Sequence, residues 1–176
     1  MSVCTVLRLG DPRLRQPSAE VGEALFGSAE LEVLIHDLRD TMAARDGAGL
    51  AAPQIGVPLR VVIYGITHNP RYPEAPPIPE TVLINPVLTP LGEETQLGWE
   101  GCLSVPGLRG QVRRQQRLHI AWRDCQGGWR QQEVEGFHAR VVQHECDHLD
   151  GLLFVDRLES SRAFGFSEEL RAAGVL

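Results

Sequence analysis

The chain has 176 residues, of which 43% are hydrophobic and 23% are charged, and its formal net charge is −6. This length and composition are ordinary for a globular protein, so we expect residues 1–176 to form a single domain with its own core. The net negative charge argues against general nucleic-acid binding, which needs a basic surface. No stretch approaches the roughly 20 apolar residues of a membrane helix.

The N-terminal residues and the cysteines bear on the cellular compartment. The first residues, MSVCTVLRLGDPRLRQ, contain neither the apolar segment nor the small-residue cleavage site of a secretion signal. The cysteines at positions 4, 102, 125 and 146 show no paired spacing, which favours reduced thiols. We therefore expect a cytoplasmic protein without a membrane anchor.

The first half of the chain contains one strong helix pattern. After a helix start at Asp11–Pro12, residues 28–45 form an expected amphipathic helix, with Ser28 as its N-cap and Gly47 as its terminator. Its apolar positions repeat with helical period and predict a buried stripe of Leu31, Leu34, Ile35, Leu38 and Met42. Residues 47–58 are too rich in glycine and proline for regular structure.

Strands are expected next, with a second helix near the end. Residues 59–65 and 81–88 are expected strands, and residues 66–80, with five prolines, are an expected surface loop. Residues 118–124 and 129–136 predict a hairpin, residues 137–151 a helix that ends at Gly151, and residues 167–174 a short last helix. The arginines before the hairpin indicate a solvated sheet face: Arg109, Arg113, Arg114 and Arg117.

A metal-binding pattern lies in the second predicted helix. His144 and His148 are four residues apart and so share one helix face, where two imidazoles can bind one metal ion. Glu145, one position on, suits a general base beside a metal-activated water. A third ligand is still needed, and Cys102 upstream is a better candidate than the acidic residues that follow the helix. A surface helix that binds nothing is the alternative at this point.

Three motifs together resemble one known family. Residues 47–56 (GAGLAAPQIG), 100–104 (EGCLS) and 143–148 (QHECDH) look like the three signature motifs of peptide deformylases, in the family's order and near its spacing. The resemblance extends from about residue 11 to about residue 158. It implies an α+β fold, with antiparallel β-sheets packed around a central helix that carries the HExxH motif. It also implies an enzyme that removes the formyl group from the N-terminal formyl-methionine of nascent polypeptides.

Residue by residue, the resemblance implies three groups of roles. Cys102, His144 and His148 would bind one divalent metal, with a water as fourth ligand. Glu145 would be the general base and later the proton donor, while Gln54 and the Leu103 N–H would form the oxyanion hole. The substrate-binding positions would be Gly47, Ala48, Gly49, Leu50, Glu100, Gly101, Arg109, Phe137, Arg140 and Val141.

The resemblance also bears on the metal, the partners and the departures from the family. It implies Fe²⁺ in the cell, replaceable by Zn²⁺, Ni²⁺ or Co²⁺, and a monomer acting on formylated nascent chains. Ala48 is smaller than the family's usual residue there, so one pocket wall is expected to be wider. Arg140 replaces an apolar residue of some members. Its stem would line the substrate entrance while its charge stays in water. Alternatively, it would be an exposed helix arginine paired with a carboxylate. Arg109 would contact the peptide or be a solvated loop residue.

Three alternatives remain at this stage. The tail after residue 158 is short and not basic, unlike the family's ribosome-docking helix, so transient ribosome association stays open. A zinc endopeptidase with the same helix motif would cleave internal peptide bonds and would not need Cys102. A non-catalytic family member that binds metal or peptide is the third alternative.

Overall fold

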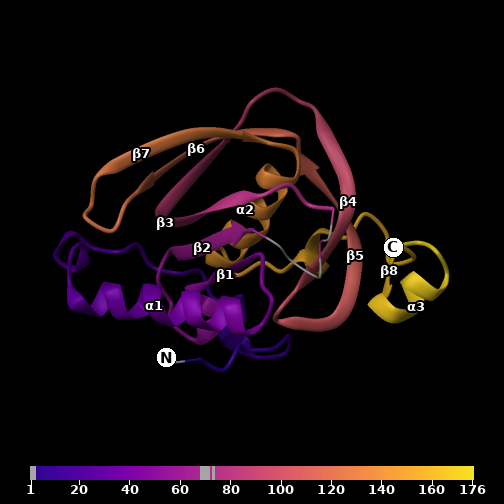
Figure 1. Ribbon diagram of the computed structural model, residues 1–176, viewed down its shortest axis with the longest axis horizontal. Helices are drawn as coiled ribbons and strands as arrows, with labels where there is room; N and C mark the ends of the chain where they lie inside the picture. Colours follow the sequence, from indigo (N-terminus) through magenta and orange to yellow (C-terminus); the bar gives the residue numbers. More distant parts are fainter. Residues whose placement is uncertain (1–2, 68–71, 73) are drawn as a thin grey trace.

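The computed structural model describes residues 3–67, 72 and 74–176. Within these ranges it combines two antiparallel sheets with α-helices (Figure 1), as expected for the α+β class. The α-helices are α1 Ala29–Ala44, α2 Gly136–Leu149 and α3 Ser167–Ala172. The strands are β1 Gly49–Ala51, β2 Val61–Ile66, β3 Ile78–Pro90, β4 Thr95–Cys102, β5 Val105–Gln115, β6 Arg117–Arg123, β7 Trp129–Glu135 and β8 Phe164–Phe166. Short 3-10 helices are η1 Pro12–Arg15, η2 Glu23–Leu25, η3 Ala52–Ile55 and η4 Phe154–Arg157.

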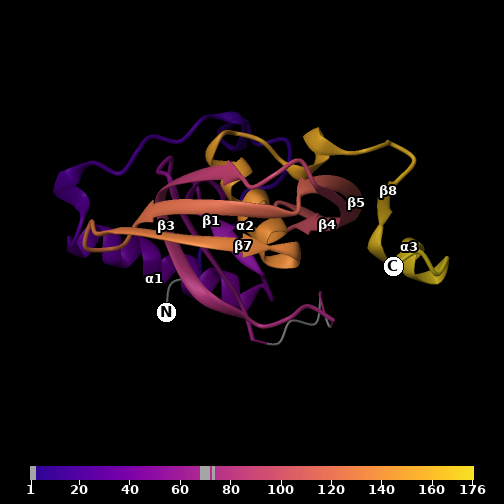
Figure 2. The same ribbon diagram turned by 90° about the horizontal axis from the view of Figure 1, so that it is seen from above.

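The strands of the described ranges form a larger and a smaller sheet. The larger sheet has the order β1-β2-β3-β6-β7, and the smaller one has the order β4-β5-β8. The predicted hairpin is confirmed: β6 pairs with β7 from Arg117 opposite Glu135 to Arg123 opposite Trp129. The smaller sheet lies along one side of α2, with contacts from Arg140 to His148, and both views place β8 and α3 at the outer side of β5 (Figures 1 and 2).

Helix α2 is the element around which the sheets are arranged. It contacts β1, β2, β3, β6 and β7 of the larger sheet and β5 of the smaller one (Figure 1). Val142 and Leu149 are fully buried against the apolar face of the larger sheet, which includes Val62, Leu83 and Ile120. Ten of the fourteen residues of α2 are buried, including both histidines, because packed elements surround it. No helix in the described part of the chain is long and apolar enough to cross a bilayer.

The ends of both main helices follow from local chemistry. At the start of α1 the Ser28 hydroxyl accepts a hydrogen bond from the Leu31 N–H at 3.2 Å, as the predicted N-cap should. The end of α1 differs from the prediction, because Asp46 rather than Gly47 takes the left-handed conformation, with φ 50°. Gly47 follows it and donates its N–H to the Met42 carbonyl at 2.9 Å. Helix α2 does end at a left-handed Gly151, with φ 73°.

Three segments differ from what the sequence predicts. Residues 47–58 are not irregular, because they contain β1 and η3. The expected loop of residues 66–80 ends earlier, since Ile78, Pro79 and Glu80 belong to β3; residues 68–71 and 73 lie outside the described part of the chain. The tail forms the expected short helix α3, but also the unexpected strand β8, which pairs with β5.

Of the four arginines on β5 and at the start of β6, two are exposed and two are buried. The side chains of Arg113 and Arg117 are 47% and 50% exposed and pair with Glu159 and with Glu133. Arg109 and Arg114 are instead buried, at 6% and 5% exposure. The prediction of a solvated face is therefore wrong for these two, and Arg114 proves to be part of the site described below.

Candidate metal centre and active site

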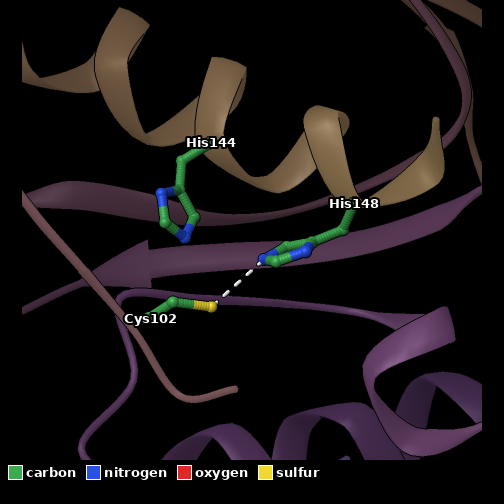
Figure 3. Close-up of side chains that lie close together, drawn as sticks. All are labelled: Cys102, His144 and His148. Atoms are coloured by element: carbon green, nitrogen blue, oxygen red, sulfur yellow. Dashed lines mark hydrogen bonds between the residues drawn. The ribbon is translucent and has the colours of Figure 1, made fainter. Parts of the chain in front are cut away.

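Cys102, His144 and His148 converge in the interior of the molecule. Cys102 ends β4, whereas the two histidines project from adjacent turns of α2 toward its sulfur (Figure 3). The Cys102 Sγ lies 3.3 Å from His148 Nε2, and all three side chains are buried with ligand atoms within 4.8 Å of one another. The structure thus brings together the three residues that the sequence analysis proposed as metal ligands.

The donor set fits a divalent transition metal. Burial alone would raise the pKa of the Cys102 thiol, but His148 and His144 beside it hold that pKa well below its usual range. A thiolate and two imidazoles are the ligands that zinc, iron, cobalt and nickel share in proteins. The group therefore has the ionisation and the composition that such an ion requires.

Glu100 orients one of the two imidazoles. His144 Nδ1 lies 2.8 Å from Glu100 Oε2, which leaves the Nε2 of His144 for a ligand. Burial by itself would raise the pKa of Glu100, but hydrogen bonds from Arg114 and His144 outweigh burial and hold the pKa well below its usual range. Glu100 is therefore an ionised hydrogen-bond acceptor in the interior, beside the Cys–His–His group.

Two buried arginines neutralise Glu100. Arg114 binds both of its carboxylate oxygens at 2.9 Å and also reaches Asp147 Oδ2 at 2.6 Å. Arg140 donates to Glu100 Oε1 at 2.9 Å. Arg140 is 6% exposed, so neither its expected charge in water nor an exposed helix position is correct. Arg157 continues the network to the surface through Asp147, at 2.7 and 2.8 Å.

Glu145 and Gly49 lie in close contact across the site. The Glu145 side chain is 5% exposed and reaches the backbone of β1. A Cβ atom at Gly49 would lie only 2.5 Å from the Cδ and Oε1 atoms of Glu145. Glycine is therefore required here by a close approach, and the carboxylate of Glu145 is held beside a strand edge rather than in solvent.

Gln54, on η3, lies beside Cys102 of the Cys–His–His group. Its Oε1 accepts a hydrogen bond from the Ala51 N–H at 2.8 Å, which fixes the amide plane. Its Nε2 donates toward Cys102 Sγ at 3.4 Å and to Ser104 Oγ at 3.1 Å. Leu103 lies between these two residues, in the tight turn that joins β4 to β5. A buried amide donor and this turn thus adjoin the sulfur.

A small cavity of about 30 Å³ adjoins His144 and Glu145. Besides these two, it is lined by Ala48, Tyr72, Trp99, Glu100, Phe137, Arg140 and Val141. Five of these, all but Tyr72 and Trp99, are residues that the sequence analysis assigned to substrate binding. Gly47 packs instead against Leu103, Leu50 is fully buried in the core beside α1, and Gly101 lies next to Tyr72.

Tyr72 and Trp99 are cavity residues that the sequence analysis missed. The Tyr72 ring lies 5.3 Å from Phe137 and 4.6 Å from the Arg109 guanidinium, and its hydroxyl donates to the Gly101 carbonyl at 3.4 Å. Arg109 is thus a buried strand residue that packs on an aromatic ring, and the expectation of a solvated loop arginine is wrong. Tyr72 is the one aromatic residue of the proline-rich segment, and Trp99 directly precedes the EGC motif; these were the available signals.

Comparison with known proteins assigns the chain and its fold to a family. The family model described as "Polypeptide deformylase" matches residues 3–164. The chain is 58% identical over 178 residues to peptide deformylase 1 of Prochlorococcus marinus, covering 100% of this chain and 91% of that protein. It is 57% identical over 165 residues to peptide deformylase 1 of Nitrosomonas europaea, covering 94% and 93%.

Solved structures agree with this assignment. The crystal structure of a class I type b peptide deformylase from Acinetobacter baumannii bound to Met-Ala-Ser superposes with a TM-score of 0.86 at 42% identity, covering 90% of this chain and 100% of that one. The structure of peptide deformylase from Thermotoga maritima gives 0.80 at 31% identity, covering 91% and 100%. Fold and site define an α+β hydrolase with a buried Cys–His–His group. The chain belongs to the polypeptide deformylase family, enzymes that remove the N-formyl group from nascent peptides.

Proposed function

We propose that this enzyme is a metal-dependent deformylase in which Cys102, His144 and His148 hold the metal and Glu145 is the general base. The observation that carries the proposal is the buried convergence of these three ligands, with Glu145 held against Gly49 beside them. A divalent metal, Fe²⁺ in the cell and replaceable by Zn²⁺, Ni²⁺ or Co²⁺, would lower the pKa of a water and polarise the formyl carbonyl. Residues 1–176 act as one catalytic unit in this proposal, as a monomer in the cytoplasm.

Side chains and backbone of the protein would perform the proton transfers and stabilise the developing negative charge. Glu145 accepts a proton from the attacking water and returns it to the amine nitrogen as the formamide C–N bond breaks. The Gln54 amide and the Leu103 N–H donate to the oxygen on which negative charge develops, each contributing about 2.7–4 kcal/mol to lowering the barrier. To reach this oxygen, the Gln54 Nε2 would turn away from Ser104 Oγ, its present acceptor. The Ala51 N–H would keep its hydrogen bond to the Gln54 Oε1.

Substrate recognition would follow from the cavity and from β1. The methionine side chain would enter the cavity beside His144, between Ala48, Phe137 and Val141. The backbone of Gly49 would accept a hydrogen bond from the peptide, which then runs along β1. The formyl carbon bears only hydrogen, so the close contact between Gly49 and Glu145 favours it over larger acyl groups. The cavity is small in this structure, so we expect Tyr72 and Phe137 to move apart when methionine binds.

The test is deformylation of formyl-Met-Ala-Ser by protein purified without oxygen, followed by formate release and by mass spectrometry. We expect Glu145→Gln to lose activity about 10²–10⁴-fold while keeping its metal, because only the proton transfer is removed. We expect Cys102→Ala to lose both metal and activity. Activity retained in both variants would contradict the mechanism, and cleavage of internal peptide bonds would favour the endopeptidase instead.

A further inference from the structure

The metal site is divided between two elements whose separation must be fixed. Cys102 ends β4, while His144 and His148 belong to α2, so the ligand distances depend on how the helix sits against the β4–β5 pair. Arg140 precedes His144 by one helical turn and so projects from the same side of α2 toward these strands. Among the residues of α2 it forms the largest number of the described hydrogen bonds to β4 and β5.

The guanidinium of Arg140 binds four acceptors on β4 and β5. Its Nη1 donates to Glu100 Oε1 and to the Val112 carbonyl, each at 2.9 Å, and to the Gly98 carbonyl at 3.4 Å. Its Nη2 donates to the Gln96 carbonyl at 2.6 Å. The acceptors on β4 belong to every second residue, Gln96, Gly98 and Glu100. Val112 lies opposite Gly98 on β5. One planar group therefore connects α2 to both strands at once.

Gly98 provides the space for this group. A Cβ atom at Gly98 would lie 2.8 Å from the Arg140 Cζ and Nη2 atoms, so the strand has no side chain where the guanidinium packs. Glu100 would keep a charged partner without Arg140, because Arg114 also binds both of its oxygens. What Arg140 adds is the connection to backbone carbonyls, which fixes position rather than charge. Lysine could not reproduce it, because an ammonium lacks the planar fork of donors.

We propose that Arg140 is a positioning residue that holds α2 at the distance from β4 at which His144, His148 and Cys102 can share one metal ion. This inference rests on the proposed function, since it assumes that these three residues bind a metal. It assigns Arg140 a role in ligand geometry, beyond lining the substrate cavity with its stem. Loss of such a supporting residue typically weakens metal binding by about 10–100-fold.

The experiment measures Co²⁺ binding to the metal-free full-length protein, by competition with a chelator and by the visible spectrum of bound Co²⁺. Arg140→Met keeps a stem of similar length but removes the four hydrogen bonds. We expect its Co²⁺ affinity to fall about 10–100-fold and the Co²⁺ bands to shift, because the thiolate and imidazoles no longer share one geometry. Gly98→Ala, which displaces the guanidinium, should change both in the same direction. Arg113→Met is the matched control, since Arg113 pairs with Glu159 on the solvent side of β5.

Each outcome bears on one statement. Unchanged Co²⁺ affinity and spectrum in folded Arg140→Met would overturn the inference. This holds even if the variant changes the free energy of unfolding or the KM for formyl-Met-Ala-Ser. Should Arg140→Met fail to fold, Gly98→Ala decides in the same way. Wild-type protein that binds no Co²⁺ would overturn the proposed metal site itself and the inference with it. Wild-type binding with an effect in both variants, and none in Arg113→Met, supports both.

Discussion

The contact between Gly49 and Glu145 makes a single methyl group a test of the catalytic geometry. We expect Gly49→Ala to lower kcat/KM about 10²-fold, since the new Cβ would begin 2.5 Å from the carboxylate and would displace it by about an ångström. Metal content should stay the same, because Glu145 is not one of the three proposed ligands. Steady-state kinetics and metal analysis on the same preparation check both points.

Gly22→Ala is the control for this substitution. A Cβ at Gly22 meets no atom within 4 Å, and Gly22 has an ordinary φ of −75°. It should leave kcat/KM unchanged. Equal activity of Gly49→Ala and the wild type would show that the carboxylate of Glu145 can move without loss, which contradicts its role as a fixed general base.

Residues of the site differ in how far sequence could predict them. The spacing of His144 and His148 indicates a shared helix face, and the three motifs together pointed to Cys102 and Gln54. The burial of Arg114 and Asp147 could not be predicted in this way, because each is paired with a residue distant in the sequence. A charged side chain is normally solvated, and only its tertiary partners reverse that expectation.

At the level of elements, the end of α2 depends on the backbone of Gly151. It has a φ of 73°, and a Cβ there would lie 2.7 Å from the Arg15 carbonyl oxygen. We expect Gly151→Ala to lower the free energy of unfolding by about 2–5 kcal/mol, because both left-handed strain and a backbone clash are introduced. Chemical denaturation followed by circular dichroism measures this change.

Gly136 at the other end of α2 separates the two causes. It has a φ of 58°, but a Cβ there meets nothing within 4 Å. Gly136→Ala should therefore lower the free energy of unfolding by only about 1–2 kcal/mol. Equal losses in the two variants would show that the contact with the backbone at Arg15 adds nothing.

Helices and strands were predicted correctly where the pattern of apolar residues repeated over enough residues to be recognised. The stripe of α1, the β6–β7 hairpin and the helix α2 all appear close to their predicted bounds. Strands β1 and β8 were missed because three residues contain too little alternation, and glycines within or beside them point to turns. Each is a strand because it pairs with a longer neighbour: β1 pairs with β2, and β8 pairs with β5.

For the whole molecule, we expect metal to contribute to global stability. The proposed ligands join α2 to β4, and the unfolded chain has no such preformed site. Co²⁺ at about 1,000 times its Kd should raise the free energy of unfolding by about 4 kcal/mol, and a chelator should remove that gain. Thermal or chemical denaturation with and without Co²⁺ measures it.

His148→Ala is the reference for the metal effect. It removes one proposed ligand, so added Co²⁺ should leave its free energy of unfolding nearly unchanged. A wild-type protein whose unfolding is insensitive to Co²⁺, although Co²⁺ is bound, would mean that the ion binds the unfolded chain as well.

The order of the larger sheet leaves β1 and β7 as its outer strands, and an outer strand can pair with a foreign chain. Along β7 every residue but Val134 is exposed, and Arg130, Glu133 and Glu135 place charges where a second strand would approach. Strand β1 has no charged residue and is fully buried beside Glu145. We therefore expect another folded protein to be repelled at β7 and unable to reach β1. In the proposed binding mode along β1, only a thin, extended chain end could reach this edge, so the need to pair as a strand would itself select the substrates.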